Sequence, residues 1–382
     1  MRTALAMAAL AASAPVAHAI TIDGANSPFT LDFNARTVEV LDGGALIVND
    51  GAAVTPPAQT LGNGLDGVSA VGSGTVVVNG GAINGGATSD GGQRAGTGLE
   101  VNGTGDVTIS GGAITGGAVS GTGASPGRAI DIDTTGTVTI TGGTLRGGAQ
   151  NGRGRIRGDA GSISNARVEI SSGDFEGAPG GNALGLIDVR NATITGGEFN
   201  GGDEEFGPGG DDSREGDGLF VAGDSVVDIL DGVFTGGDSL VSGNFGSALS
   251  VAERSEVTIF GGTFTGGLND AQACAGDPLL CDRGDVLSAN LDGVFNLRGG
   301  VFDGTALLFQ SSILNIFGLP DLMFDGTKIT GTLLSGEAID LEIAFRDPNT
   351  QVNLNVIPLP AGAWLLLSGI AAMGAARRFR RA

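Results

Sequence analysis

The chain lacks tyrosine altogether and holds one histidine, His18, one tryptophan, Trp364, and one lysine, Lys328. Histidine, lysine and tyrosine supply many of the general acids, general bases and activated nucleophiles of enzymes. Their scarcity leaves arginine and the carboxylates for catalysis and excludes a Ser-His-Asp arrangement in the body of the chain. The two cysteines also cannot complete the four ligands of a structural zinc site, because His18 lies in the N-terminal segment and no other histidine is present.

Basic residues are scarce as well, because 20 lysines and arginines face 42 aspartates and glutamates, giving a net charge of -22. Partners rich in phosphate need clustered lysine and arginine. The balance excludes nucleic acid as a partner and argues against binding to an anionic membrane surface. Hydrophobic residues still make up 41% of the chain, which is enough for a sizeable core.

Residues 1–19 have the layout of a secretory signal peptide, with Arg2, a short apolar stretch and an Ala-x-Ala ending at Ala17 and Ala19. We expect cleavage before Ile20 and export of the rest of the chain. The alternative is an alanine-rich first helix of the folded domain.

Residues 356–382 combine three elements: Pro358-Leu359-Pro360-Ala361, an apolar run from Ala361 to Ala376, and a basic end. As a helix the run would span about 24 Å, slightly less than the bilayer core of about 30 Å. Basic residues after the run predict a cytoplasmic C-terminus. They are Arg377, Arg378, Arg380 and Arg381.

These C-terminal residues resemble the VPLPA variant of the PEP-CTERM sorting signal of Gram-negative bacteria, with Ile357 in place of the valine. The resemblance covers only residues 356–382. It implies processing by an exosortase, transient insertion of the precursor in the inner membrane, and cleavage near the proline motif. The protein would then reach the cell surface or the extracellular matrix, in cells that often make exopolysaccharide. A plain single-pass anchor that stays in place is the alternative.

One phrase, typified by VTISGGAITGG at 107–117, recurs along the middle of the chain with variable spacing. Apolar residues stand four and two positions before a glycine pair, with mostly polar residues between them, as in a half-buried strand. Another apolar column follows the pair, and a glycine stands two positions later. These glycines predict bends that need positive φ or close backbone approach. The first position of the pair is Gly80, Gly111, Gly142, Ser172, Gly196, Asp231, Gly261 or Gly299.

Several copies also carry a short upstream strand, such as GLEV at 98–101. One copy cannot bury its own apolar face and must stack on its neighbours. We therefore predict an all-β fold, a single-stranded parallel β-helix of right-handed hand. The predicted segments are the signal peptide at 1–19, an N-terminal cap at 20–60, the repeats at 61–305, a C-terminal cap at 306–355 and the sorting signal at 356–382.

The loop at 201–218 is the best candidate for a ligand site, because it holds seven acidic residues and a single basic residue, Arg214. Calcium takes about six to eight oxygen ligands, which this loop can supply. A solvated acidic loop without metal is the alternative, and no other cofactor is predicted. The acidic residues are Asp203, Glu204, Glu205, Asp211, Asp212, Glu215 and Asp217.

Cys274 and Cys281 lie in the longest insertion between copies, and in an exported protein they predict a disulfide.

A regular scaffold with variable loops favours an exported structural or adhesive protein without catalytic residues. The alternative is a polysaccharide lyase or hydrolase of the β-helix type, which needs a carboxylate pair or a base. The one basic cluster of the repeats, Arg153, Arg155 and Arg157, would have to supply such a base or bind an acidic polysaccharide.

Overall fold

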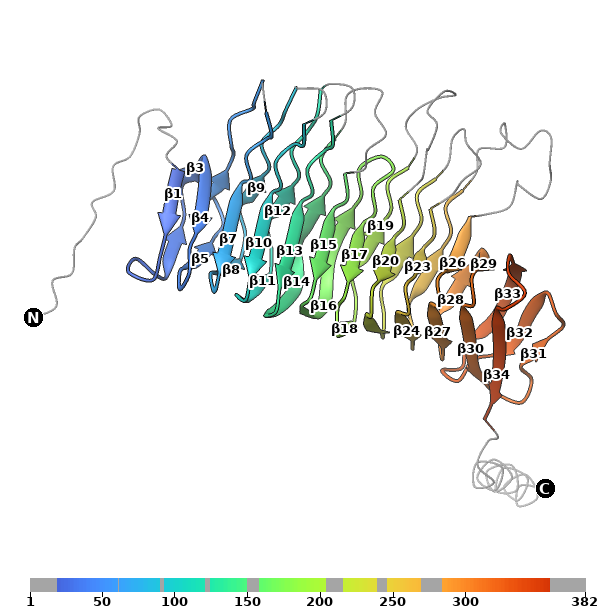
Figure 1. Cartoon of the computed structure of the whole chain (residues 1–382). Coiled ribbons are helices and arrows are strands. Elements are labelled where there is room, and N and C mark those ends of the chain that lie inside the picture. Colours follow the sequence, from blue (N-terminus) through green and yellow to red (C-terminus); the bar gives the residue numbers. More distant parts are fainter. Residues whose placement is uncertain are drawn as a thin grey trace, which may run out of the picture.

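The computed structural model describes residues 19–60, 62–89, 93–120, 124–149, 158–203, 216–238, 246–268 and 284–357. Every regular element in these ranges is a β-strand. Successive coils stack into an elongated rod whose long axis runs from the N-terminal to the C-terminal end (Figure 1). The predicted all-β parallel solenoid is therefore confirmed. Among the described residues there is also no helix long and apolar enough to cross a bilayer.

Most coils contribute one strand to each of three parallel columns. The first column is the 14-stranded sheet, in the order β1 (Ala19–Ile22), β4 (Thr37–Val40), β7 (Val68–Gly72), β10 (Leu99–Gly103), β13 (Ile130–Thr134), β15 (Gly161–Ser164), β17 (Leu184–Ile187), β20 (Leu219–Ala222), β23 (Leu249–Val251), β26 (Asp285–Ala289), β29 (Thr305–Leu308), β33 (Ala338–Phe345), β32 (Lys328–Thr332) and β31 (Met323–Phe324).

The other two columns share the 20-stranded sheet. The second column holds β2 (Phe29–Leu31), β5 (Ala45–Val48), β8 (Thr75–Val78), β11 (Val107–Ile109), the starts of β14 (Thr137–Arg146) and β16 (Arg167–Glu176), β18 (Asn191–Ile194), β21 (Val226–Ile229), β24 (Glu256–Ile259), β27 (Val294–Leu297), β30 (Ile313–Gly318) and β34 (Gln351–Val356). The third column holds β3 (Asn34–Ala35), β6 (Ala53–Val54), β9 (Ala82–Asn84), β12 (Ala113–Thr115), the ends of β14 and β16, β19 (Glu198–Asn200), β22 (Val233–Thr235), β25 (Thr263–Thr265) and β28 (Val301–Asp303).

Residues at the same position of the sequence repeat are register partners in neighbouring strands. Val107 pairs with Val76 on one side and with Val138 on the other. The same alignment holds in the third column, where Ile114 pairs with Ile83. All five side chains are buried, because alternate residues of each strand face the interior of the rod.

A ladder of phenylalanines fills the C-terminal half of the core. Phe175, Phe199, Phe234 and Phe264 are fully buried, and their neighbouring rings stack at centroid distances of 4.6, 4.7 and 4.8 Å. These spacings match the separation of about 4.8 Å between paired strands, so each ring lies over the ring of the next coil. Phe302 ends the ladder at 5.2 Å and is only partly buried.

The two glycine columns of the repeat have different roles. The second glycine of each pair has a positive φ, and these residues are Gly81, Gly112, Gly143, Gly173, Gly197, Gly232, Gly262 and Gly300. The later glycine of most copies has an ordinary φ but lies against another backbone segment. A Cβ on Gly116, for example, would overlap the carbonyl oxygen of Gly127.

The two ends of the rod differ. At the N-terminal end, the strands at 37–54 pair in register with the coil that follows. At the C-terminal end, β33 joins β29 in parallel and then pairs with β32 in the antiparallel direction. This hairpin closes the first column with a change of strand direction.

Both predicted targeting segments fall largely outside the described residues. Ala17 of the signal peptide lies there, as do Pro358, Leu359, Pro360, Ala361 and the four terminal arginines of the sorting signal. Ala19 is described: it is the first residue of β1 and pairs with Thr37.

We predict that Phe234→Ala lowers the free energy of unfolding by about 3–5 kcal/mol, because it leaves a cavity between two stacked rings. Phe302→Ala should cost clearly less, since that ring is partly exposed and has one stacked neighbour. Denaturant unfolding followed by circular dichroism measures both. Equal losses in the two variants would show that the stability contributed by a ring does not depend on how deeply it is buried in the ladder.

Candidate functional site

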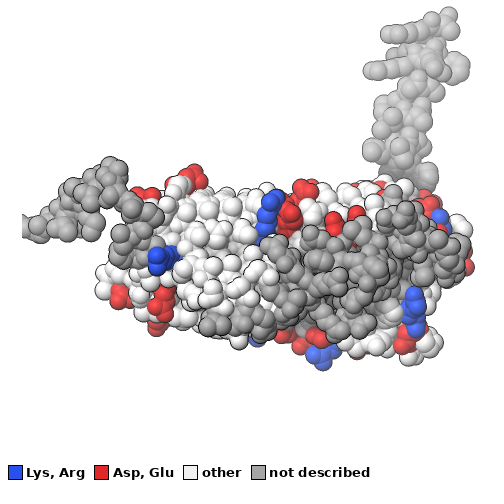
Figure 2. All heavy atoms as spheres, turned by 90° about the horizontal axis from the view of Figure 1, so that it is seen from above, with Lys and Arg blue, Asp and Glu red and all other residues white. Residues whose placement is uncertain are grey.

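All the variable segments of the described coils leave the rod at one edge, between the third column and the next strand of the first column. Figure 1 shows the described parts of these connections along the upper edge. Figure 2 looks onto that edge and shows mostly uncharged surface among the described residues of the N-terminal half. Between Gly86 and Gly284 the shortest connection is 179–180 and the longest is 268–283, whereas single residues, Arg36 and Gly304, join β3 to β4 and β28 to β29. Length and sequence therefore vary most at this place, since the connections from the first to the second column keep to two to four residues from β4 to β30.

Two backbone segments meet at the base of each connection, and we call this meeting point the neck. The outgoing residue of the neck is Gly86, Gly117, Gly148, Ala178, Gly202, Gly237 or Gly267, and the return residue is Gly96, Gly127, Gly158, Gly181, Gly216, Gly246 or Gly284.

The glycine positions of the necks leave no room for a side chain, and Ala178 is the one neck residue that carries a Cβ. A Cβ on Gly127 would overlap the carbonyl oxygen of Gly96, and a Cβ on Gly216 would overlap that of Gly181. No larger residue fits there without a backbone shift, because the obstructing atoms are backbone. The necks thus keep the variable connections outside the packed coils.

Amide hydrogen bonds run from neck to neck along the rod. The Gly96 amide donates to the Gly86 carbonyl at 2.8 Å, and the Gly117 amide donates to the Gly96 carbonyl at 2.8 Å. Gly127 and Gly148 continue the alternation, with amide–carbonyl distances of 2.9 and 2.8 Å. The same pattern links Gly202, Gly216, Gly237, Gly246, Gly267 and Gly284. The amides of most necks are therefore paired both within their own coil and toward the preceding one.

The first connections stack on one another above their necks. Thr88 forms parallel bridges to Gln59 and Val119, and Arg94 forms one to Ser125. A small second hydrophobic cluster of Ala95, Val119 and Ala124 lies beneath them.

Side-chain oxygens bind backbone amides of the following coil on both sides of the necks. On the return side, Asp217 Oδ1 accepts the Ser247 amide at 2.8 Å. On the outgoing side, Asp203 Oδ1 accepts the Asp238 amide at 2.9 Å. These two residues of the predicted calcium loop therefore flank one neck, and each holds a neighbouring coil in place.

The other calcium candidates, Glu204, Glu205, Asp211, Asp212 and Glu215, lie outside the described residues. The same is true of the predicted disulfide cysteines, Cys274 and Cys281, and of Arg153, Arg155 and Arg157. In the described part of the chain, no group of three or more His, Cys, Asp or Glu is arranged to hold a metal ion. Calcium binding by the loop stays a prediction.

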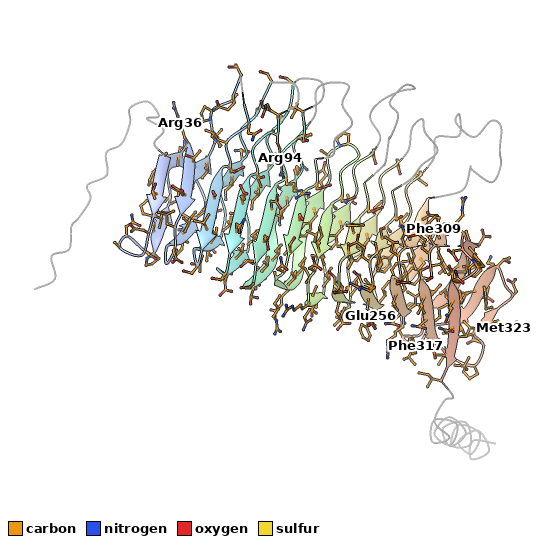
Figure 3. The ribbon with its side chains drawn as sticks, viewed as in Figure 1. Arg36, Arg94, Glu256, Phe309, Phe317 and Met323 are labelled. Carbon is orange, nitrogen blue, oxygen red and sulfur yellow. The ribbon has the colours of Figure 1, made fainter. Side chains whose placement is uncertain are left out.

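A cluster of opposite charges that sequence reasoning missed lies at the base of the first connections. Glu100 and Asp131 are register partners on the outer face of the first column. Arg94, labelled in Figure 3, pairs with Asp131 at 3.1 Å. Arg128 bridges Asp131 at 3.1 Å and Asp159 at 3.2 Å. The available signal was the 31-residue spacing of Glu100 and Asp131, which equals the repeat.

Two carboxyl groups near the return necks hold protons near neutral pH. A hydrogen bond with Asp66, burial, and the charges of Asp66 and Asp131 raise the pKa of Glu100 to about 7, against the opposing charge of Arg94. Burial and the charge of Asp217 raise the pKa of Asp285 to about 7, against Arg346. A protonated carboxyl beside ionised ones can act as a proton donor.

No protein-family model matches the chain, and no curated protein or solved structure is significantly similar to it.

We predict that the rod is less stable at pH 8 than at pH 5. Glu100 and Asp285 have folded pKa values near 7, above the unfolded values of 4.5 and 3.8. Their contribution is full below the unfolded pKa and is lost as the pH rises through about 7. Thermal unfolding at both pH values measures the difference.

Glu100→Gln should reduce this loss at pH 8, and Asp285→Asn should act in the same direction. Glu39→Gln, an exposed carboxyl of the same outer face, is the matched control and should leave the pH difference unchanged. A pH difference that stays the same in all three variants would contradict the assignment.

Proposed function

We propose that this protein is an exported structural or adhesive component of the cell surface or extracellular matrix. A stiff rod presents variable loops along one edge, and binding is done by the loops. The observation that carries the proposal is the row of glycine necks, which confines sequence variation to one edge of a constant scaffold. Acidic loops such as the one between Gly202 and Gly216 would bind calcium or exopolysaccharide components.

The proposal includes the targeting steps that the termini imply. The signal peptide directs export before Ile20, and an exosortase cleaves the precursor near Pro358–Ala361 while it is held in the inner membrane of a Gram-negative bacterium. The single-stranded β-helix is right-handed in this proposal, in accord with the handedness of parallel β-strand crossovers.

A polysaccharide hydrolase is the second candidate, and one observation favours it. Glu100, with its pKa near 7, has the protonation of a general acid at neutral pH, but its hydrogen-bonded partner Asp66 is closer than the second carboxylate of a retaining or inverting glycosidase. Shortening of an exopolysaccharide by the wild-type protein but not by Glu100→Gln would favour the enzyme. Co-sedimentation with the polysaccharide without shortening favours the adhesive role.

The targeting steps predict the mass and the cell fraction of the mature protein. In an exosortase-containing host, intact-mass analysis should show a chain that begins at Ile20 and lacks the residues after the proline motif. Replacing Pro358 and Pro360 with alanine should leave the protein in the inner membrane fraction with its C-terminus intact.

Pro56 and Pro57, which lie inside the folded region, provide the control, and their replacement with alanine should not change the processing. A mature wild-type protein that retains residues 361–382 would overturn exosortase sorting and favour a permanent anchor.

A further inference from the structure

The bend between the second and third columns changes character along the rod. In the early coils the residue at this bend is polar, as with Asn79, Ser110 and Thr195. In the later coils the same position holds Leu230, Phe260, Arg298 and Phe317, each directly after residues that pair in register. The final strand, β34, again places a polar residue, Asn355, beside Phe317.

Around this bend the last coils expose apolar side chains. We call the following set the exit strip: Leu230, Val233, Phe260, Val301, Leu334, Val356 and Ile357, each between 38% and 51% exposed, together with Arg298. Leu334 joins the strip because its amide donates to the Phe317 carbonyl at 2.9 Å. Thr263 lies between Val233 and Val301 in the third column, so the strip is a row of exposed apolar side chains with polar interruptions. Gathered exposed apolar side chains of this kind mark a contact surface.

Arg298 is held on the strip by aromatic rings. Its guanidinium carbon lies 4.4 Å from the centroid of Phe317 and 5.7 Å from that of Phe260. Its Nε is buried without a hydrogen-bond partner, and no described carboxylate forms an ion pair with it. The guanidinium of Arg298 can stack on the rings and still donate hydrogen bonds from its terminal nitrogens. Such an arginine suits a partner that is apolar where it touches the rings and carries anionic oxygens nearby.

The chain leaves the rod within this strip. Val356 pairs with Gly318, and the Ile357 amide donates to the Gly318 carbonyl at 2.9 Å, directly after Phe317. Figure 3 shows Phe317 at the lower edge of the rod. The apolar run at 361–376 begins four residues after Ile357.

We propose that the exit strip rests on the surface of a lipid bilayer while residues 361–376 are inserted. This inference rests on the membrane-held precursor of the proposed function. The strip begins at the chain segment that enters the bilayer, so its apolar side chains lie next to lipid, and Arg298 meets the headgroup phosphates. A second copy of the chain fits less well, because two chains of net charge -22 repel each other. The same charge favours zwitterionic over anionic lipid, since apolar contact rather than net charge drives the binding.

The test uses the exported full chain, reconstituted into phosphatidylcholine vesicles, with Cys274 and Cys281 replaced by serine. One nitroxide label is attached to Val301→Cys and, in a second protein, to Ala113→Cys, an exposed position of the same column far from the strip. The label at 301 should lose its broadening by a water-soluble nickel complex and gain broadening by oxygen. The label at 113 should keep its broadening by nickel.

Phe260→Asp in the 301-labelled protein should restore the broadening by nickel, because it places a charge within the strip. A label at 301 that is as open to nickel as the label at 113, in protein that floats with the vesicles, overturns this inference alone. Spin–spin broadening at 301 indicates a second copy on the strip and also overturns it. Protein that does not float with the vesicles overturns both the membrane segment and this inference.

Discussion

The structure depends on the close approach of two backbone segments at the necks, from Gly86 to Gly284. Each coil must leave its strands and return to them within a few ångströms, and the carbonyl oxygens there occupy the space of a Cβ. Glycine is the residue that permits this approach without a backbone shift. The amides and carbonyls brought together in this way bond to one another along the rod, so buried polar groups at the necks are paired.

With the necks closed, the strand register between neighbouring coils determines how the core side chains pack. Parallel strands separated by about 4.8 Å place equivalent side chains over one another, so that a valine lies on a valine and a phenylalanine ring on a phenylalanine ring. A register slip of one residue would turn an entire apolar set outward. The bulge in the pairing of β14 with β16 lies at the glycine-pair bend, and the alignment of Leu145 with Phe175 is recovered after it. The stack therefore absorbs a bulge at a bend and differences in loop length, but not a change of register within the strands.

Residues that repeat could be predicted from the sequence, and single contacts between coils could not. Val107, Ile109 and Ile114 recur with the period of a coil, so their burial and register followed from the pattern. The contact between Glu100 and Asp66 depends on how the chain returns through a neck, which a periodic pattern does not encode. The stacking of Arg298 on Phe260 and Phe317 is likewise specific to the last coils. The columns of glycine indicated bends, but only the structure separates positive φ at Gly112 from close approach at Gly116.

The central claim is that the necks separate the stability of the rod from the content of its loops. The coil closed through Ala178, Pro179, Gly180 and Gly181 already forms a neck with a minimal connection. The most direct measurement is denaturant unfolding of two variants, one with residues 204–215 replaced by a single glycine and one with Gly216→Ala. The shortened loop should change the free energy of unfolding by no more than about 0.5 kcal/mol. Gly216→Ala should lower it by about 1–3 kcal/mol, because the added Cβ overlaps the Gly181 carbonyl oxygen. A clear loss of stability in the shortened-loop variant, or an unchanged free energy of unfolding in Gly216→Ala, would contradict this role of the necks.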